Sequence, residues 1–300
     1  MPTWNQIDKE IDGLGGPDAC DKVRKKYLRA LADTIGRPVI AYYSGFLQKR
    51  TPDGRMHPEA FISDNDLNGF MAVIHGLDRK KGLDLILHTP GGDIEATRSI
   101  VEYLYKMFGK NIGSIVPHMA MSAGTMIACA TKKVSLAKHS CLGPTDPHIN
   151  GLPAMGVLAE VDRAIQEIKA EPLKQIIWQQ VFAKYPPAFI LNCERSIEGS
   201  RSMVKAWLQS GMLSDHDNPE QAAEATVGQL MNYGGTSGHN QHFLIDKCKE
   251  IGLKIIEIEH NQEFQEAVLS VHHAYMASFA RTKSIKIIEN CDGGTWAVAV

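Results

Sequence analysis

The chain has 300 residues, of which 44% are hydrophobic and 22% charged, and its formal net charge is −2. This length can bury a large core, either as one α/β domain or as a core domain with a helical extension. No block of Lys and Arg stands out, which argues against nucleic acid as the main partner. HExxH and zinc-finger spacings of Cys and His are absent, so the sequence predicts no metal site and no cofactor.

The cysteines and the N-terminus bear on the compartment. Six cysteines are scattered along the chain without a CxxC pair, which suits free thiols in a reducing environment. The N-terminus is polar and lacks a signal-peptide core, and the longest apolar runs are well short of the ~20 residues that span a bilayer. We therefore expect a cytoplasmic protein with no membrane partner.

The first half of the chain alternates between helix and strand patterns, which predicts parallel strands joined by right-handed crossovers. Ser63 and Asp66 form a capping signature for one helix, and Asp93 is placed to cap another whose apolar positions have a period of 3.6. In chain order we expect a helix over 18–36, a strand over 38–43, a helix from Ser63 towards Gly76, a strand over 83–88, a helix from Asp93, a strand over 112–117, a helix over 123–130 and a strand over 134–137.

The second half is dominated by helices, which we expect to pack on the first half. A glycine-rich segment, 234–239, interrupts them. The expected elements are helices over 154–170, 172–184 and 187–210, a helix over 243–251, a strand over 254–258, a helix over 262–280 and a strand over 285–288.

Ser122 is the candidate nucleophile because it lies where a strand gives way to a small-residue helix. Ala123 and Gly124 follow it, so the chain can turn sharply there, and a helix N-terminus favours negative charge. The pattern resembles a nucleophile elbow without having the GxSxG form. The alternative is that Ser122 is an ordinary N-cap, because serine is among the commonest capping residues.

Gly91 and Gly92 are candidates for binding an oxyanion through their backbone amides. They follow a buried strand, and glycine exposes its N–H group to whatever lies beyond the strand end. The alternative is a tight turn into the helix capped by Asp93. Because the two loops follow consecutive parallel strands, we expect the glycine pair and Ser122 to face one crevice.

The general base cannot be chosen from spacing alone. In an extended chain His118 lies ~13 Å from Ser122, so we expect it to be structural. Asp146 lies in a rigid turn, Gly143–Pro147, that can hold a carboxylate in place. His148, His239 and His242 all remain candidates for the base.

Three motifs together resemble the serine dehydrogenase proteinase family, distant relatives of the Clp protease in the Clp/crotonase superfamily. They are HTPGGD (88–93), MSAGTMIA (121–128) and LGPTDPHI (142–149), and the resemblance covers about residues 37–255. It implies a Clp/crotonase-like spiral of parallel βα units with an added helical region. The domain division that we expect is an N-terminal helical segment (1–36), a catalytic domain (37–258) with a helical insertion at about 154–231, and a C-terminal helix and strand (259–300).

The resemblance also implies a serine peptidase that uses Ser, Asp and His in that chain order. Carried over by motif, Ser122 is the nucleophile, Asp146 orients the base and His239 is the base, while the amides of Gly91 or Gly92 and of Ala123 bind the oxyanion. The residues after His239 depart from the family pattern, which leaves His242 as a rival. A Ser–Lys dyad, as in some superfamily members, would instead use Lys169 or Lys174.

Two other functions compete with the hydrolysis of peptide bonds. One is crotonase-type chemistry on an acyl thioester, which uses the same oxyanion site without a serine nucleophile. The other is a non-catalytic scaffold with the Clp fold. The substrate that we expect is a peptide or protein, and by analogy with compartment-forming relatives we expect a homo-oligomer that buries the apolar faces of helices in 154–231.

Overall fold

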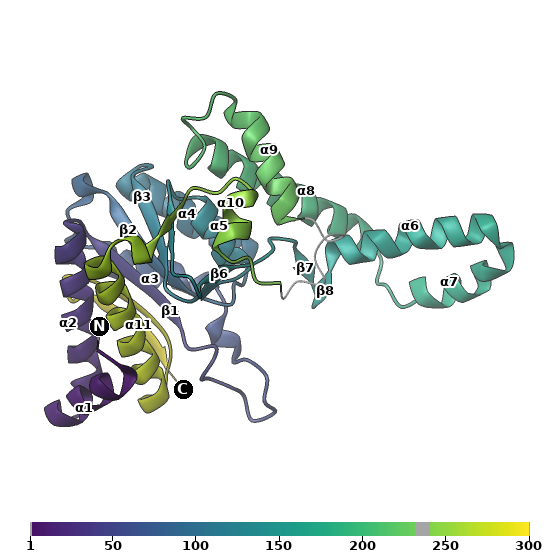
Figure 1. Cartoon of the computed structure of the whole chain (residues 1–300). Helices are drawn as coiled ribbons and strands as arrows, with labels where there is room; N and C mark the ends of the chain where they lie inside the picture. Colours follow the sequence, from purple (N-terminus) through teal and green to yellow (C-terminus); the bar gives the residue numbers. More distant parts are fainter. Residues whose placement is uncertain (1, 232–240, 300) are drawn as a thin grey trace.

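A seven-stranded sheet forms the centre of the molecule in the computed structural model, which describes residues 2–231 and 241–299 (Figure 1). The strand order is β11-β10-β1-β2-β3-β5-β9. The strands are β1 (Val39–Ser44), β2 (Leu83–His88), β3 (Ile112–Val116), β4 (Met119–Ala120), β5 (Val134–Leu136), β6 (Cys141–Leu142), β7 (His148–Ile149), β8 (Leu152–Pro153), β9 (Ile255–Glu257), β10 (Ser284–Asn290) and β11 (Thr295–Ala299).

Helices lie around this sheet, with α2 and α11 side by side and α3, α4 and α5 packed in succession. The α-helices are α1 (Trp4–Leu14), α2 (Ala19–Ile35), α3 (Asn65–Ile74), α4 (Ile94–Phe108), α5 (Ala123–Cys129), α6 (Ala154–Ala170), α7 (Gln175–Phe182), α8 (Phe189–Ser210), α9 (Pro219–Leu230), α10 (Ile245–Glu250) and α11 (Gln262–Arg281). Short 3-10 helices are η1 (Pro58–Ala60), η2 (Arg79–Lys81), η3 (Pro172–Lys174) and η4 (Ile258–His260).

The pairing of the central strands confirms the prediction of a mixed α/β fold with parallel strands. β1, β2, β3, β5 and β9 run parallel, and Ile86 of β2 pairs with Ile115 of β3. All six residues of β2 are buried, as expected for a strand covered on both faces. β10 and β11 continue the sheet beyond β1 in antiparallel orientation. The chain therefore brings its C-terminal strands beside the strand that follows its N-terminal helices.

Several local predictions are confirmed, and others need correction. Asp93 caps α4, because its carboxylate accepts a hydrogen bond from the Ala96 amide at 2.8 Å. The helix predicted from Ser63 begins at Asn65 instead, and the Asp66 carboxylate accepts from the Ser63 amide at 3.1 Å. The helix predicted over 172–184 is divided into η3 and α7, and neither α9 nor β11 was predicted.

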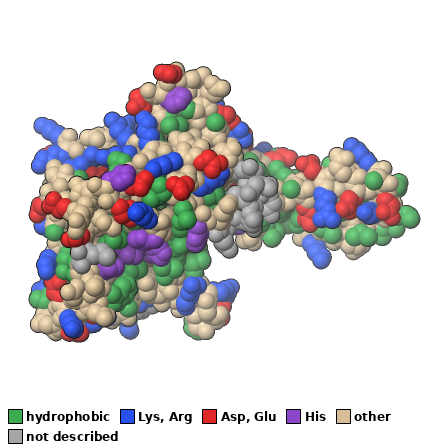
Figure 2. Space-filling view, viewed as in Figure 1, with side chains coloured by type: hydrophobic (Ala, Val, Ile, Leu, Met, Phe, Trp, Pro, Cys, Tyr) green, Lys and Arg blue, Asp and Glu red, His purple; other side chains and the backbone are tan. Residues whose placement is uncertain are grey.

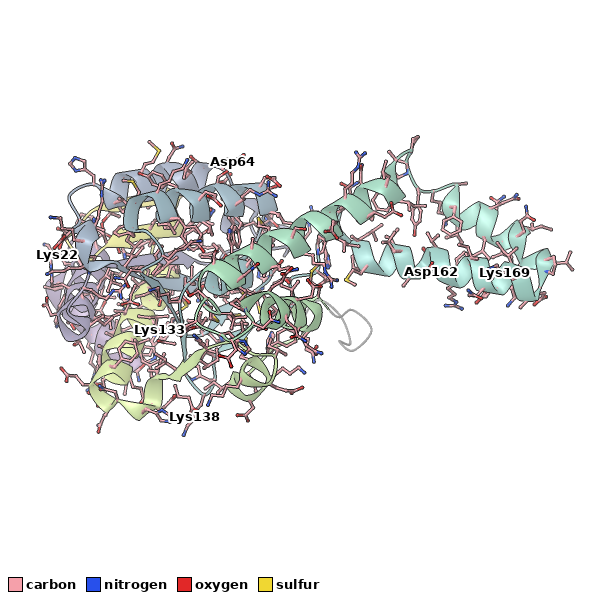
Figure 3. All side chains as sticks on the ribbon, turned by 90° about the horizontal axis from the view of Figure 1, so that it is seen from above. Lys22, Asp64, Lys133, Lys138, Asp162 and Lys169 are labelled. Atoms are coloured by element: carbon pink, nitrogen blue, oxygen red, sulfur yellow. The ribbon has the colours of Figure 1, made fainter. Side chains whose placement is uncertain are left out.

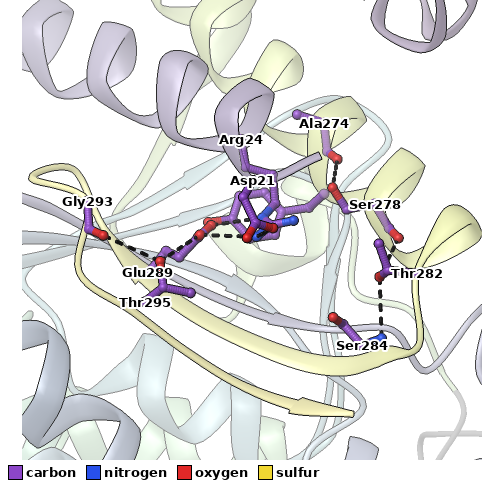
Figure 4. A network of polar contacts seen from close by, with 10 residues as sticks. Asp21, Arg24, Ala274, Ser278, Thr282, Ser284, Glu289, Gly293 and Thr295 are labelled. Carbon is purple, nitrogen blue, oxygen red and sulfur yellow. Dashed lines mark hydrogen bonds and ion pairs between the residues drawn. The ribbon is translucent and has the colours of Figure 1, made fainter. Parts of the chain in front are cut away.

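Buried ion pairs attach the C-terminal strand β10 to the rest of the sheet. Arg24 of α2 binds Glu289 of β10 at 2.9 Å, and Thr295 also donates to Glu289 (Figure 4). On the same strand, Lys286 binds Asp66 of α3 at 2.7 Å, and both side chains are almost completely buried. The two ion pairs join residues more than 200 positions apart, so the two ends of the chain share one core.

An arm projects from this core. We use the name for residues 154–182, which comprise α6, η3 and α7; α8 returns from it to the body (Figures 1 and 3). A small apolar cluster separate from the main core lies at its base and includes Val157 and Phe189. Lys169 and Asp162, labelled in Figure 3, lie on α6 within this arm.

Candidate active site

Ser122 occupies a strained backbone position between β4 and α5. Its φ and ψ are 50° and −117°, and it is one of three described non-glycine residues with positive φ. Such a conformation costs of order 1–3 kcal/mol and is concentrated at functional sites. Although Ser122 stands at the N-cap position of α5, its side chain makes no capping hydrogen bond within the described chain. The capping alternative therefore does not account for this serine.

Gly91 and Gly92 lie against two different parts of the site. A Cβ on Gly91 would meet Ser122 Cβ at 2.8 Å and the Ala123 nitrogen at 3.0 Å. A Cβ on Gly92 would lie 2.3 Å from the backbone nitrogen of Ile62. Both have positive φ, so the conformation and the close backbone approach each require glycine. The loop after β2 and the turn at Ser122 thus meet at one point, as expected.

The backbone amides around Ser122 are not equivalent. The Gly91 amide donates to Thr89 Oγ1 at 3.1 Å, whereas the Gly91 carbonyl accepts from the Ile62 amide at 2.8 Å. For the amides of Gly92 and Ala123, the described residues provide no hydrogen-bond acceptor. Ala123 is the first residue of α5, where an amide has no partner inside the helix. Two donors therefore remain near Ser122 after the internal hydrogen bonds have formed.

The Asp146 carboxylate and the His148 ring lie next to each other beside this turn. His148 Nε2 lies 3.4 Å from Asp146 Oδ2, and the carboxylate is buried. The loop before Asp146 is anchored because the Gly143 amide donates to Thr125 Oγ1 at 2.9 Å. The short hairpin β7–β8 begins at His148, so its backbone is also constrained.

Two cavities meet at Ser122. The first has a volume of about 510 Å³ and mostly apolar walls; we call it the apolar cavity. The second, of about 350 Å³, is lined by carboxylates, hydroxyls and Arg195, and we call it the polar cavity. Of the described residues, Gly92, Ser122 and His148 border both. A bound substrate can therefore extend to either side of the serine.

The predicted bases lie in different places. His239 lies outside the described residues. His242 borders the apolar cavity together with Ser122 and His148. Lys169 and Lys174 belong to the arm, and Lys174 is ion-paired with Glu167 at 3.7 Å.

A group of histidines under the glycine loop was not predicted. His88, at the end of β2, stacks on His118 with ring centroids 5.5 Å apart, and His272 of α11 lies 5.3 Å from His88. Figure 2 shows histidine side chains gathered on one face of the molecule. His88 is buried, and neither of its ring nitrogens has a hydrogen-bond partner among the described residues. Sequence spacing alone could not find this group, because it joins three elements.

Burial determines the charge of these histidines. It is the main reason, with a smaller contribution from the neighbouring His118, that the pKa of His88 is lowered to about 3. The pKa of His118 is also lowered, first by burial and then by His139 and His242. Burial, together with His88 and His118, lowers the pKa of His272. The histidine group is therefore uncharged near neutral pH.

The described residues lack two further features. No group of three or more His, Cys, Asp or Glu side chains there has an arrangement that could hold a metal ion. None of the helices in 2–231 and 241–299 combines the length and the apolar character needed to cross a bilayer.

Comparison with known proteins gives two similar chains, both uncharacterized proteins of Methanocaldococcus jannaschii. One is 37% identical over 103 residues, which is 34% of this chain and 36% of the relative. The other is 27% identical over 195 residues, which is 65% of this chain and 59% of the relative. The chain thus matches about a third of the length of one relative and under two thirds of the length of the other. Residues 57–184, which contain Ser122, the glycine pair and Asp146, match the model of the ClpP-like SDH-type serine proteinase family, confirming the resemblance inferred from the three motifs.

Proposed function

We propose that the protein is a serine peptidase that cleaves peptide bonds through an acyl-enzyme on Ser122. The observation that carries the proposal is the strained turn at Ser122, whose hydroxyl makes no capping bond and lies beside two amides without internal acceptors. Acyl transfer needs this combination of a nucleophile and preorganised donors. The match of residues 57–184 to a serine proteinase family supports it.

In the proposed reaction, Ser122 Oγ attacks the carbonyl carbon of the substrate and a histidine takes its proton. The carbonyl oxygen becomes negatively charged, and the amides of Gly92 and Ala123 donate to it. The tetrahedral intermediate then collapses, and the leaving amine departs with the proton from the histidine. Water hydrolyses the acyl-enzyme by the same steps. Loss of one oxyanion donor costs about 3 kcal/mol of transition-state stabilisation.

The Gly91 amide is the weaker of the predicted oxyanion donors. It already donates to Thr89 Oγ1, so we assign to Gly91 a supporting role. Its lack of a side chain lets the loop approach Ser122, since a Cβ would meet Ser122 Cβ at 2.8 Å. Gly92 and Ala123 are then the donors in the proposed site.

For the base, we retain the residue that the family resemblance implies, His239, with Asp146 as the carboxylate that orients it. Asp146 suits this role because it is buried in an anchored turn that borders the polar cavity together with Ser122. Single substitutions of His239, His242 and His148 by Ala separate the candidates. The base is the histidine whose loss reduces acylation of Ser122 by about 100- to 10,000-fold.

The wider setting of the site is proposed on the same basis. We propose a Clp/crotonase-like spiral for the catalytic domain 37–258, with 1–36 and 259–300 as flanking segments, and a cytoplasmic location. We also propose that the chain forms a homo-oligomer through its arm. Support for the oligomer comes from Leu173, Ile176 and Ile177, which are large apolar side chains exposed on the arm.

A fluorophosphonate probe tests the nucleophile directly, because it reacts only with an activated serine. We expect covalent labelling of the wild type and identification of Ser122 as the labelled residue by mass spectrometry. Ser122→Ala should abolish the labelling while leaving the folded state intact. If the wild type labels no better than Ser122→Ala, the proposal is wrong.

A further inference from the structure

Thr89 is hydrogen-bonded to both halves of the proposed oxyanion site. It directly follows β2 and is buried. Its hydroxyl accepts a hydrogen bond from the Gly91 amide at 3.1 Å, and its carbonyl accepts one from the Met121 amide at 3.0 Å. Met121 immediately precedes Ser122. One residue is therefore bonded to the glycine loop and to the turn that presents the serine.

The side chain of Thr89 also touches the first turn of α5. A Cβ on Gly124 would meet Thr89 Cγ2 at 2.5 Å, so the glycine lets the helix approach this methyl group closely. The Thr89 amide donates to the Met119 carbonyl of β4 at 3.1 Å. Through these contacts Thr89 sets the position of the N-terminus of α5, where the Ala123 amide lies, relative to the glycine loop.

The segment around Ile62 holds the glycine loop from another side. The Ile62 amide donates to the Gly91 carbonyl at 2.8 Å, and the Asp93 amide donates to the Ile62 carbonyl at 2.9 Å. Gly92 lies between these two anchored neighbours, and neither bond uses its own amide. The loop is therefore fixed while the Gly92 amide stays available to an oxyanion.

A buried polar network supports both of these anchors. Lys286 Nζ donates to the Phe61 carbonyl at 2.6 Å and is ion-paired with Asp66 at 2.7 Å. Asp66 Oδ2 accepts a hydrogen bond from the Tyr42 hydroxyl at 2.7 Å, and Tyr42 interacts with the side chain of Thr89. All four side chains are buried. The Asp66 carboxylate thus connects the segment around Phe61 with Thr89.

We propose that Thr89 is a positioning residue, which holds the glycine loop and the turn at Ser122 at the separation that lets the Gly92 and Ala123 amides bind one oxyanion. This inference rests on the proposed function. Thr89 borders neither of the described cavities that meet at Ser122, so it acts through the two amides and does not touch the substrate. Donors of this kind stabilise a transition state because they are fixed in place before the charge develops.

Thr89→Val tests the hydroxyl, because valine keeps the shape of the side chain and removes the acceptor for the Gly91 amide. We expect the second-order rate constant for labelling of Ser122 by a fluorophosphonate to fall by about 10- to 100-fold, since the phosphonyl oxygen occupies the oxyanion site. Thr89→Ser keeps the hydroxyl and should retain most of the wild-type rate. Tyr42→Phe, which removes the next hydroxyl of the network, should slow labelling by a smaller factor. A wild-type rate in Thr89→Val, or in Tyr42→Phe if Thr89→Val does not fold, would overturn the inference.

Thr131→Val is the matched control for a purely structural effect. Thr131 is also a buried threonine, and its hydroxyl donates to the Ala128 carbonyl at 2.8 Å, beyond the C-terminal end of α5. It borders neither of the two cavities at Ser122. Both valine variants should lose a similar free energy of unfolding in urea, but Thr131→Val should be labelled at the wild-type rate. If the two variants slow labelling equally, Thr89 acts only on stability and the inference is wrong.

A double variant tests whether Thr89 acts through the Gly92 amide. Gly92→Ala alone displaces that donor, so adding Thr89→Val to it should slow labelling by a much smaller factor than Thr89→Val does in the wild type. Fully multiplicative losses would show that Thr89 acts by another route and would refute the inference. Failure of the wild type to be labelled at Ser122 would instead overturn the proposed function, so the two failures are distinguishable.

Discussion

The site around Ser122 and the arm differ in how much their side chains are buried. Near Ser122, the sheet and its loops are fixed by buried groups, and a strained serine is held against a glycine whose Cβ position would meet backbone atoms. In the arm, Leu173 is 75% exposed and Ile176 and Ile177 are each 64% exposed. The body therefore depends on each buried contact, whereas the outer arm residues contribute little to the stability of the monomer.

The largest loss of stability is expected from Lys286→Met, because it leaves Asp66 buried without its cation. Lys286 also donates to the Phe61 carbonyl at 2.6 Å, next to the segment that pairs with Gly91 and Asp93. Removal of one partner of a buried ion pair costs about 3–5 kcal/mol, measured here as the free energy of unfolding in urea.

A second substitution provides the control for this pair. Asp66→Asn removes the uncompensated charge and keeps an oxygen that can accept from Tyr42 and Ser63. The double variant that combines Lys286→Met with Asp66→Asn should therefore recover part of the stability lost in Lys286→Met. If Lys286→Met alone is as stable as the wild type, the body tolerates the loss of a buried contact, and the expected difference in stability between the body and the arm is wrong.

The next largest effect is expected from Gly92→Ala, which acts on the reaction. The added methyl group would lie 2.3 Å from the Ile62 nitrogen, so the loop must shift and carry the Gly92 amide away from the oxyanion. We expect kcat to fall by about 100- to 1,000-fold, as for the loss of one oxyanion donor. Gly228→Ala on α9 is the matched control, because its Cβ would meet nothing within 4 Å. Equal activity of the two variants would exclude the Gly92 amide from the mechanism.

The sequence predicted the local elements of the fold but not its long-range pairings. β2, β3 and the Asp93 cap of α4 were predicted because each depends on neighbouring residues. The pairing of Asp66 with Lys286 joins residues 220 positions apart, and Asp66 was assigned from the sequence to a local capping role. Long-range pairs leave no periodic signal, so the position of β10 beside β1 was not predicted either.

The site was predicted in the same uneven way. Ser122, Gly91 and Gly92 could be chosen as candidates because strand-to-helix turns and paired glycines have a local signature, and their catalytic roles stay predictions. The positive φ of Ser122 and the engagement of the Gly91 amide by Thr89 depend on tertiary packing, and sequence patterns do not encode them. The role of His239 remains a prediction, since that residue lies outside the described part of the chain.

Acid is expected to destabilise the body through the histidine group. The pKa of His88 is about 3 in the folded protein, below the ordinary value of 6.5, so the unfolded chain takes up the proton first. The stability due to neutral His88 is complete above pH 6.5 and is lost as the pH falls from 6.5 towards 3. The free energy of unfolding should decrease by about 1.4 kcal/mol per pH unit for each such histidine.

His88→Phe tests this slope, because Tyr43 and Phe46 already pack their rings against His88. The variant should lose the contribution of one proton to the slope between pH 6 and pH 4, while His118 and His272 retain theirs. Urea denaturation at several pH values measures the difference. An unchanged slope would mean that His88 does not remain neutral in the folded protein.

The smallest effect on stability is expected in the arm. Replacing Leu173, Ile176 and Ile177 by Lys, one at a time, should change the free energy of unfolding by less than about 0.5 kcal/mol, because the side chains are already in water. In the proposed oligomer the same substitutions place charges in an apolar interface, so sedimentation should show smaller species. If the variants assemble like the wild type, the interface lies elsewhere on the molecule. If the wild type itself sediments as a monomer, the proposal of self-association is wrong. A stability loss of several kcal/mol would show instead that the arm, like the sheet, is held by contacts within one chain.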